Sequence, residues 1–110
     1  MQMNDYHRRA DATLAYWLHA LEPAFESGAL EELELSDGAL TIETDLGKIF
    51  VLSKHNVTQQ IWLASPVSGG LHFQWHDTDG TWNLSDGRTL TSVLNTELRA
   101  QGIEVDDGTF

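Results

Sequence analysis

Carboxylates gather at one end of this chain in a pattern that could bind cations. Ten of the seventeen Asp and Glu residues fall within residues 1–45, where only Arg8 and Arg9 carry a full positive charge. Like charges crowded onto one small surface repel one another unless a cation approaches. Carboxylates and imidazoles such as His7 are donors for metal ions, and the same charge attracts a basic protein surface. A metal ion, a basic partner and plain solubility are therefore the three interpretations of this acidic end.

The remaining composition excludes several classes of protein. At 110 residues, 41% of them apolar, the chain is long enough for one compact domain and too short for two, so we expect a single domain over residues 1–110. The sequence has no cysteine, which excludes disulfides and thiolate catalysis and fits a cytosolic compartment. A net charge of -11 disfavours nucleic acid and anionic membranes, and no apolar stretch reaches the roughly 20 residues that span a bilayer.

The acidic end begins with a predicted helix. Apolar residues recur at helical spacing over residues 4–21 or 4–27, and Asn4 or Asp5 is placed to cap the first turn. Pro23 predicts an end or a kink near Leu21, because an interior proline removes a backbone hydrogen bond. At about 100° per residue, one flank of this helix collects a histidine and several carboxylates. These residues are His7, Asp11, Glu22 and Glu26.

After Gly28 the pattern changes from helical to alternating, and short strands follow one another through turn residues such as Asp37 and Gly38. The predicted strands cover residues 32–35, 39–44, 48–53, 59–65, 71–75 and 81–84. Thr89 then caps a final helix that ends near Gly102, followed by a tail over residues 103–110. We therefore predict an α+β two-layer sandwich, with the N- and C-terminal helices packed on one face of an antiparallel sheet of about six strands.

The fourth predicted strand places a tryptophan on the open face of that sheet. If Ile61 is buried, the alternation puts Gln60 and Trp62 on the opposite side. A tryptophan directed at solvent is a candidate binding anchor, and the alternative is that a loop or neighbouring side chain covers it. The next strand places His72 and His76 on the same face, four residues apart and too distant to chelate one ion together. We interpret these histidines mainly as partner contacts.

This strand carries a resemblance to a known family. The run Gln60-Ile61-Trp62-Leu63-Ala64-Ser65-Pro66 is similar to the most recognisable strand of the frataxin family, including its bacterial CyaY-type members. The resemblance covers residues 4–102. Its further matching points are Tyr6-His7-Arg8-Arg9-Ala10-Asp11, Gly38-Ala39-Leu40-Thr41-Ile42, Ser68-Gly69, Phe73, Trp75, Trp82 and Asp86-Gly87.

The resemblance implies an iron-binding protein that docks on the cysteine desulfurase and the scaffold protein of iron–sulfur cluster assembly, where it supplies or senses iron. Metal contacts in that family lie on an acidic ridge formed by the first helix and the first strand. The matching positions here are His7, Asp11, Glu22, Glu32 and Glu34, and the partner-binding positions on the open sheet are Gln60, Trp62 and His72. Because no closed ligand set is evident, we expect Fe²⁺ or Fe³⁺ to bind weakly. We expect a monomer that can form metal-dependent oligomers.

Departures from the family pattern leave other functions open. Gln59 stands where some bacterial relatives have histidine, and Leu18 and His19 stand where some have acids, so the iron stoichiometry is undetermined. The residues alone also permit His7 and Asp11 to be an ordinary surface pair. No motif of a dedicated enzyme is present. The alternatives are a ferroxidase or iron-storage protein with weak activity at its carboxylates, and a metal-independent acidic interaction module.

The expected location follows from the same features. A start at Met1 without an arginine-rich leader favours a bacterial cytoplasm, and a eukaryotic host would imply the mitochondrial matrix.

Overall fold

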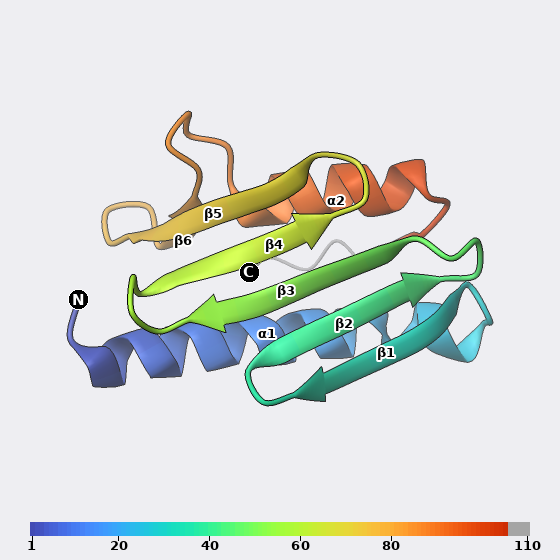
Figure 1. The fold of residues 1–110 in the computed structure, drawn as a ribbon, viewed down its shortest axis with the longest axis horizontal. Helices are drawn as coiled ribbons and strands as arrows, with labels where there is room; N and C mark the ends of the chain where they lie inside the picture. Colours follow the sequence, from blue (N-terminus) through green and yellow to red (C-terminus); the bar gives the residue numbers. More distant parts are fainter. Residues whose placement is uncertain (106–110) are drawn as a thin grey trace.

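A computed structural model describes residues 1–105 and confirms the predicted architecture. The elements in chain order are α1 (Met3–Glu26), β1 (Leu30–Ser36), β2 (Ala39–Thr44), β3 (Ile49–His55), β4 (Gln60–Ser65), β5 (Gly69–His76), β6 (Thr81–Asn83) and α2 (Leu90–Ala100). Figure 1 shows the sheet in front and both helices behind it, α1 behind the half that contains β1 and α2 behind the half that contains β5. The result is two layers with one sheet face left open.

The sheet is a simple meander in which each strand pairs antiparallel with the next, in the order β1-β2-β3-β4-β5-β6. The first hairpin shows why the local sequence enforces this order. Asp37 and Gly38 form a two-residue loop between the paired Ser36 and Ala39, and both loop residues have positive φ, 53° and 76°. That combination is the turn whose twist matches the flanking strands, and Asp-Gly is a preferred sequence for it.

The core lies between the helices and the covered sheet face. Alternate strand residues point into it, and α1 contributes a stripe at helical spacing. The largest fully buried side chains are Trp17, Tyr6, Phe50 and Phe73. Ile103 is also buried and Val105 packs against the core, which confirms that the start of the predicted tail folds back onto the domain. The rest of that tail, residues 106–110, lies outside the described residues.

The predicted cap of α1 is wrong. Neither Asn4 nor Asp5 caps it, because the helix already begins at Met3, with Gln2 at the cap position and no side-chain capping bond. Of the two predicted ends, near Leu21 or near residue 27, the second is confirmed, because the helix continues past Pro23 to Glu26. Pro23 removes one amide donor from the helix, but its backbone carbonyl still accepts a 3.0 Å hydrogen bond from the amide of Ser27, so the last turn stays closed.

The predicted features of α2 are confirmed. The Thr89 hydroxyl accepts a 3.1 Å hydrogen bond from the backbone amide of Ser92, and Gly102 follows the helix with a φ of 82°. None of the described helices is long and apolar enough to cross a membrane.

Candidate functional site

Two of the carboxylates predicted on α1, Asp11 and Glu22, are already engaged by neighbouring side chains. Asp11 forms a 2.9 Å ion pair with Lys54 of β3, whose side chain is only 14% exposed. Glu22 contacts the ring of His19 at 2.9 Å within the same helix, and the His7 ring lies 5.3 Å from the ring of Tyr6. A cation approaching α1 must therefore compete with Lys54 for the charge of Asp11.

The glutamates of β1 are in a different position. Leu33 pairs with the buried Ile42 and packs on the core, so Glu32 and Glu34 lie on the open sheet face. Glu32 stands directly opposite Glu43 of β2, which places two like charges in one cross-strand pair. Such a pair is unfavourable when no counter-charge is present. We call Glu32, Glu34 and Glu43 the acidic edge.

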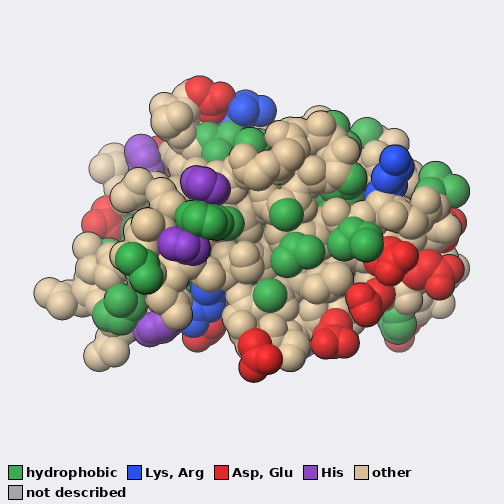
Figure 2. Space-filling view, viewed as in Figure 1, with side chains coloured by type: hydrophobic (Ala, Val, Ile, Leu, Met, Phe, Trp, Pro, Cys, Tyr) green, Lys and Arg blue, Asp and Glu red, His purple; other side chains and the backbone are tan. Residues whose placement is uncertain are grey.

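No cation among residues 1–105 neutralises the acidic edge. Among residues 1–105, none of its three carboxylates has an ion pair or hydrogen bond to a side chain. Figure 2 shows acidic side chains gathered along the side of the open face formed by β1 and β2. The acidic edge is therefore an uncompensated negative surface at the boundary of the sheet.

The predicted ligands do not meet in one chelating group. In the described part of the chain, no three His, Asp or Glu side chains lie close enough together to hold one ion. The ridge anticipated across helix and strand is divided, because α1 covers one face of the sheet and Glu32 and Glu34 lie on the other. The iron ligands therefore remain a prediction for His7, Asp11, Glu22, Glu32 and Glu34. An ion bound there would meet an open carboxylate surface and not a closed site.

A second surface on the open face is built from stacked rings. Trp62 lies between His55 and His72, with ring centroids 3.7 Å and 4.0 Å from those of the two histidines and interplanar angles of 7° and 12°. We call these three residues the aromatic stack. Both interpretations of Trp62 hold in part, since its two faces are covered by histidines while the residue remains half-buried at the surface. Figure 2 shows histidine and hydrophobic side chains side by side over the β3–β5 part of the open face.

Hydrogen bonds fix the edges of the stack. The indole N–H of Trp62 donates to Oε1 of Gln60 at 2.8 Å, and the Thr58 hydroxyl donates to the same oxygen at 3.0 Å. Because the single hydroxyl hydrogen of Thr58 is used there, Nδ1 of His55, 2.7 Å from Thr58 Oγ1, must donate its proton to that oxygen. This chain of hydrogen bonds fixes the orientations of His55, Gln60 and Trp62.

Backbone support for the stack comes from α1. The Tyr6 hydroxyl donates a 2.8 Å hydrogen bond to the backbone carbonyl of Gln60, the first residue of β4. Burial is the largest effect on this phenol and raises the pKa of Tyr6 above its ordinary value of 10.0. Beside the stack, a hollow of about 390 Å³ is lined in part by Gln60, His72 and His76. The predicted partner residues Gln60, Trp62 and His72 are thus brought together on one surface.

Three contributors escaped the sequence analysis. The sequence pattern assigned no role to Glu43, Lys54 or His55. Strand register supplies the missing signal, since Glu43 pairs with Glu32, while Ser53 pairs with Trp62 and puts His55 on the same face two residues further along β3. The contact of Lys54 with Asp11 joins residues 43 positions apart and has no local signature.

Comparison with known proteins places this arrangement in a class. The model of the frataxin-like domain matches residues 1–104, and the chain belongs to that family. Among curated relatives, an iron-sulfur cluster assembly protein CyaY from Thioalkalivibrio sulfidiphilus is 38% identical, with 81% of this chain and 92% of that protein covered. The mitochondrial frataxin homolog of Saccharomyces cerevisiae is 35% identical over 89% of this chain, which spans 57% of that longer protein.

Solved structures agree with this placement. One is a crystal structure of trimeric frataxin from Saccharomyces cerevisiae complexed with ferrous iron. It superposes with a TM-score of 0.74 at 34% identity, and the match covers 84% of this chain and 84% of that one. Frataxin from Psychromonas ingrahamii superposes with a TM-score of 0.83 over 99% of this chain and all of that one, at 17% identity, which supports the fold alone.

Proposed function

We propose that this chain is an iron-binding regulator of iron–sulfur cluster assembly that docks on a cysteine desulfurase and its scaffold protein. Membership of the frataxin-like family supports the proposal, as does the similarity to relatives named iron-sulfur cluster assembly proteins. The observation that carries it is the acidic edge, where Glu32 faces Glu43 without a counter-charge from the described residues. Such a surface gains stability when either iron or a basic protein face approaches.

Iron in this proposal is cargo that is held weakly. Surface carboxylates on two strands attract Fe²⁺ or Fe³⁺ but enclose neither ion, so exchange with solvent is fast. Weak binding suits a protein that must release or sense iron. The desulfurase then competes for the same carboxylates through its basic residues, while the aromatic stack supplies a rigid contact for the scaffold.

A titration of Fe²⁺ into ¹⁵N-labelled protein under anaerobic conditions tests the iron assignment. We expect the amides of β1 and β2 beside Glu32 and Glu43 to broaden at lower iron than those around Asp11, because Lys54 neutralises Asp11. The variant Glu32→Gln/Glu43→Gln should lose the early broadening, and Asp79→Asn/Glu104→Gln should keep it at the same net charge. Broadening that begins elsewhere and is indifferent to Glu32→Gln/Glu43→Gln would remove iron from the acidic edge.

Metal-independent docking is the second candidate function. It is favoured by the observation that no three metal donors cluster within residues 1–105. A desulfurase activity assay with and without an iron chelator separates the two candidates. If iron acts through the acidic edge, the chelator changes the effect of this protein on sulfur release; if the edge acts by charge alone, added salt weakens the effect and the chelator leaves it intact.

A further inference from the structure

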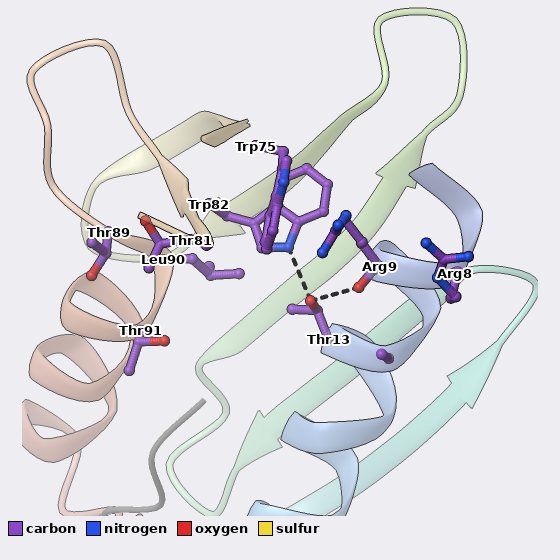
Figure 3. A pocket seen from close by; sticks show the side chains of 11 residues that line it. Arg8, Arg9, Thr13, Trp75, Thr81, Trp82, Thr89, Leu90 and Thr91 are labelled. Carbon is purple, nitrogen blue, oxygen red and sulfur yellow. Dashed lines mark hydrogen bonds between the residues drawn. The ribbon is translucent and has the colours of Figure 1, made fainter. Parts of the chain in front are cut away.

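A pocket on the helix-covered side of the molecule belongs to neither surface described above. It has a volume of about 320 Å³ and lies between α1, the end of the β5–β6 hairpin and the first turn of α2. Figure 3 shows Trp75 and Trp82 from the hairpin on one side, Leu90 and Thr91 from α2 on another, and Arg9 from α1. Small-molecule sites begin at roughly 300 Å³, so this pocket matches a small ligand.

The polar groups of Thr13, Trp75 and Trp82 in the pocket wall are already paired. The Thr13 hydroxyl donates to the backbone carbonyl of Arg9 at 2.8 Å and accepts from the indole N–H of Trp82 at 2.9 Å. The indole N–H of Trp75 donates to Asp77 at 2.7 Å. With these groups already paired, the wall offers ring faces and aliphatic carbons, which suit an apolar body.

The mouth of the pocket carries one guanidinium that is available to a ligand. The Arg9 guanidinium carbon lies 4.5 Å from the centroid of the Trp75 ring, and no carboxylate of residues 1–105 pairs with it. Arg8 differs, since it forms a 2.8 Å ion pair with Asp5 and lies farther from Trp75 than Arg9 does in Figure 3. Stacking on the ring leaves the N–H groups at the rim of the guanidinium free to bind a carboxylate in two places.

We propose that this pocket binds a small carboxylic acid with a flat or compact apolar body. The apolar part would lie against Trp75 and Trp82, and the carboxylate would pair with Arg9. Arg9 has no carboxylate partner among residues 1–105 although the chain has a net charge of -11, and it lies beside an apolar hollow. It is complementary to a ligand that combines a negative charge with an apolar body. The first turn of α2, capped by Thr89, adds its positive dipole end to the same side of the pocket.

Binding of indole-3-acetate, with the neutral indole-3-acetamide as its matched control, tests the proposal in the full chain. In ¹H–¹⁵N spectra we expect the acetate to shift the indole N–H signals of Trp75 and Trp82, and the acetamide to bind about tenfold more weakly for want of the charged hydrogen bonds. Arg9→Gln should remove this preference. Arg99→Gln changes the net charge equally but lies in the last turn of α2, and should retain it.

A further variant tests the location without disturbing the core. Ala12 lines the pocket from an exposed position on α1, so Ala12→Leu fills the space while keeping a good helix former. We expect it to abolish binding of both compounds, with circular dichroism unchanged. Equal affinity for acetate and acetamide, a preference that survives in Arg9→Gln, undiminished binding in Ala12→Leu, or no saturable shift up to about 10 mM acetate would each overturn the proposal.

Discussion

The acidic edge and the aromatic stack share one sheet face but are organised in opposite ways. In the aromatic stack, rings lie 3.7 Å and 4.0 Å apart and hydrogen bonds fix Trp62 and His55. In the acidic edge, Glu32 and Glu43 face each other with no bond from any described side chain. A fixed surface selects a partner by shape, while a loose charged surface attracts cations of many shapes. Under the proposed function, the aromatic stack would supply specificity and the acidic edge would supply attraction, both on one face.

Replacing Trp62 should have the largest effect on docking. Trp62→Ala removes the ring held between His55 and His72, and we expect affinity for the desulfurase–scaffold complex to fall about 30-fold, or ~2 kcal/mol. Calorimetry at two salt concentrations would measure it, with a similar loss at both. Val57→Ala, in the adjoining turn at a residue 90% exposed, is the control and should bind normally. An unchanged affinity for Trp62→Ala would show that the aromatic stack is not the anchor.

Neutralising the acidic edge should act mainly on the rate of association. We expect Glu32→Gln/Glu43→Gln to associate with a basic desulfurase surface about fivefold more slowly at low salt, with the difference disappearing at high salt. Stopped-flow mixing measures the rates. Asp79→Asn/Glu104→Gln removes the same charge elsewhere and should associate at the wild-type rate. Slower association in both variants would mean that net charge, and not the acidic edge, steers the encounter.

Replacing Tyr6 tests how much the hydrogen bond from α1 to β4 contributes to stability. Tyr6→Phe leaves the backbone carbonyl of Gln60 without its 2.8 Å partner and should cost about 1 kcal/mol in the free energy of unfolding. Burial raises the folded pKa of Tyr6 above 10.0, so the phenol's contribution is complete below pH 10 and is lost as pH rises from there toward the folded pKa. Urea unfolding should therefore show the advantage of the wild type over Tyr6→Phe shrinking above pH 10. A constant difference would contradict the burial of the phenol.

The sequence predicted what depends on local pattern. Alternation identified every strand, Asp37-Gly38 identified the first hairpin, and Thr89 identified the start of α2, because each is decided by residues close in the chain. Alternation also placed Gln60, Trp62 and His72 together on the open face.

What the sequence could not supply depends on pairing across distance. The ion pair of Lys54 with Asp11 requires β3 to pass under α1, and the position of His55 against Trp62 requires the β3–β4 register. Pro23 shows a different limit, since local propensity left the end of α1 open between Leu21 and residue 27, and the structure ends the helix at Glu26. The division of the acidic ridge between two faces follows from such tertiary placement, and so charge counting alone overestimated how closely its members meet.

The smallest expected effect measures the repulsion within the acidic edge itself. Glu43→Lys converts the cross-strand pair with Glu32 from like to opposite charge, and we expect it to raise the free energy of unfolding by about 0.5 kcal/mol. Because salt screens repulsion in the wild type and attraction in the variant, added salt should stabilise the first and slightly destabilise the second. Thr41→Lys, opposite Glu34, adds an opposite-charge pair without removing the repulsion and should gain less. Urea unfolding at low and high salt measures all three proteins. If Glu43→Lys gains nothing at low salt, Glu32 and Glu43 already avoid each other through solvent, and the acidic edge holds no repulsion that an approaching cation could relieve.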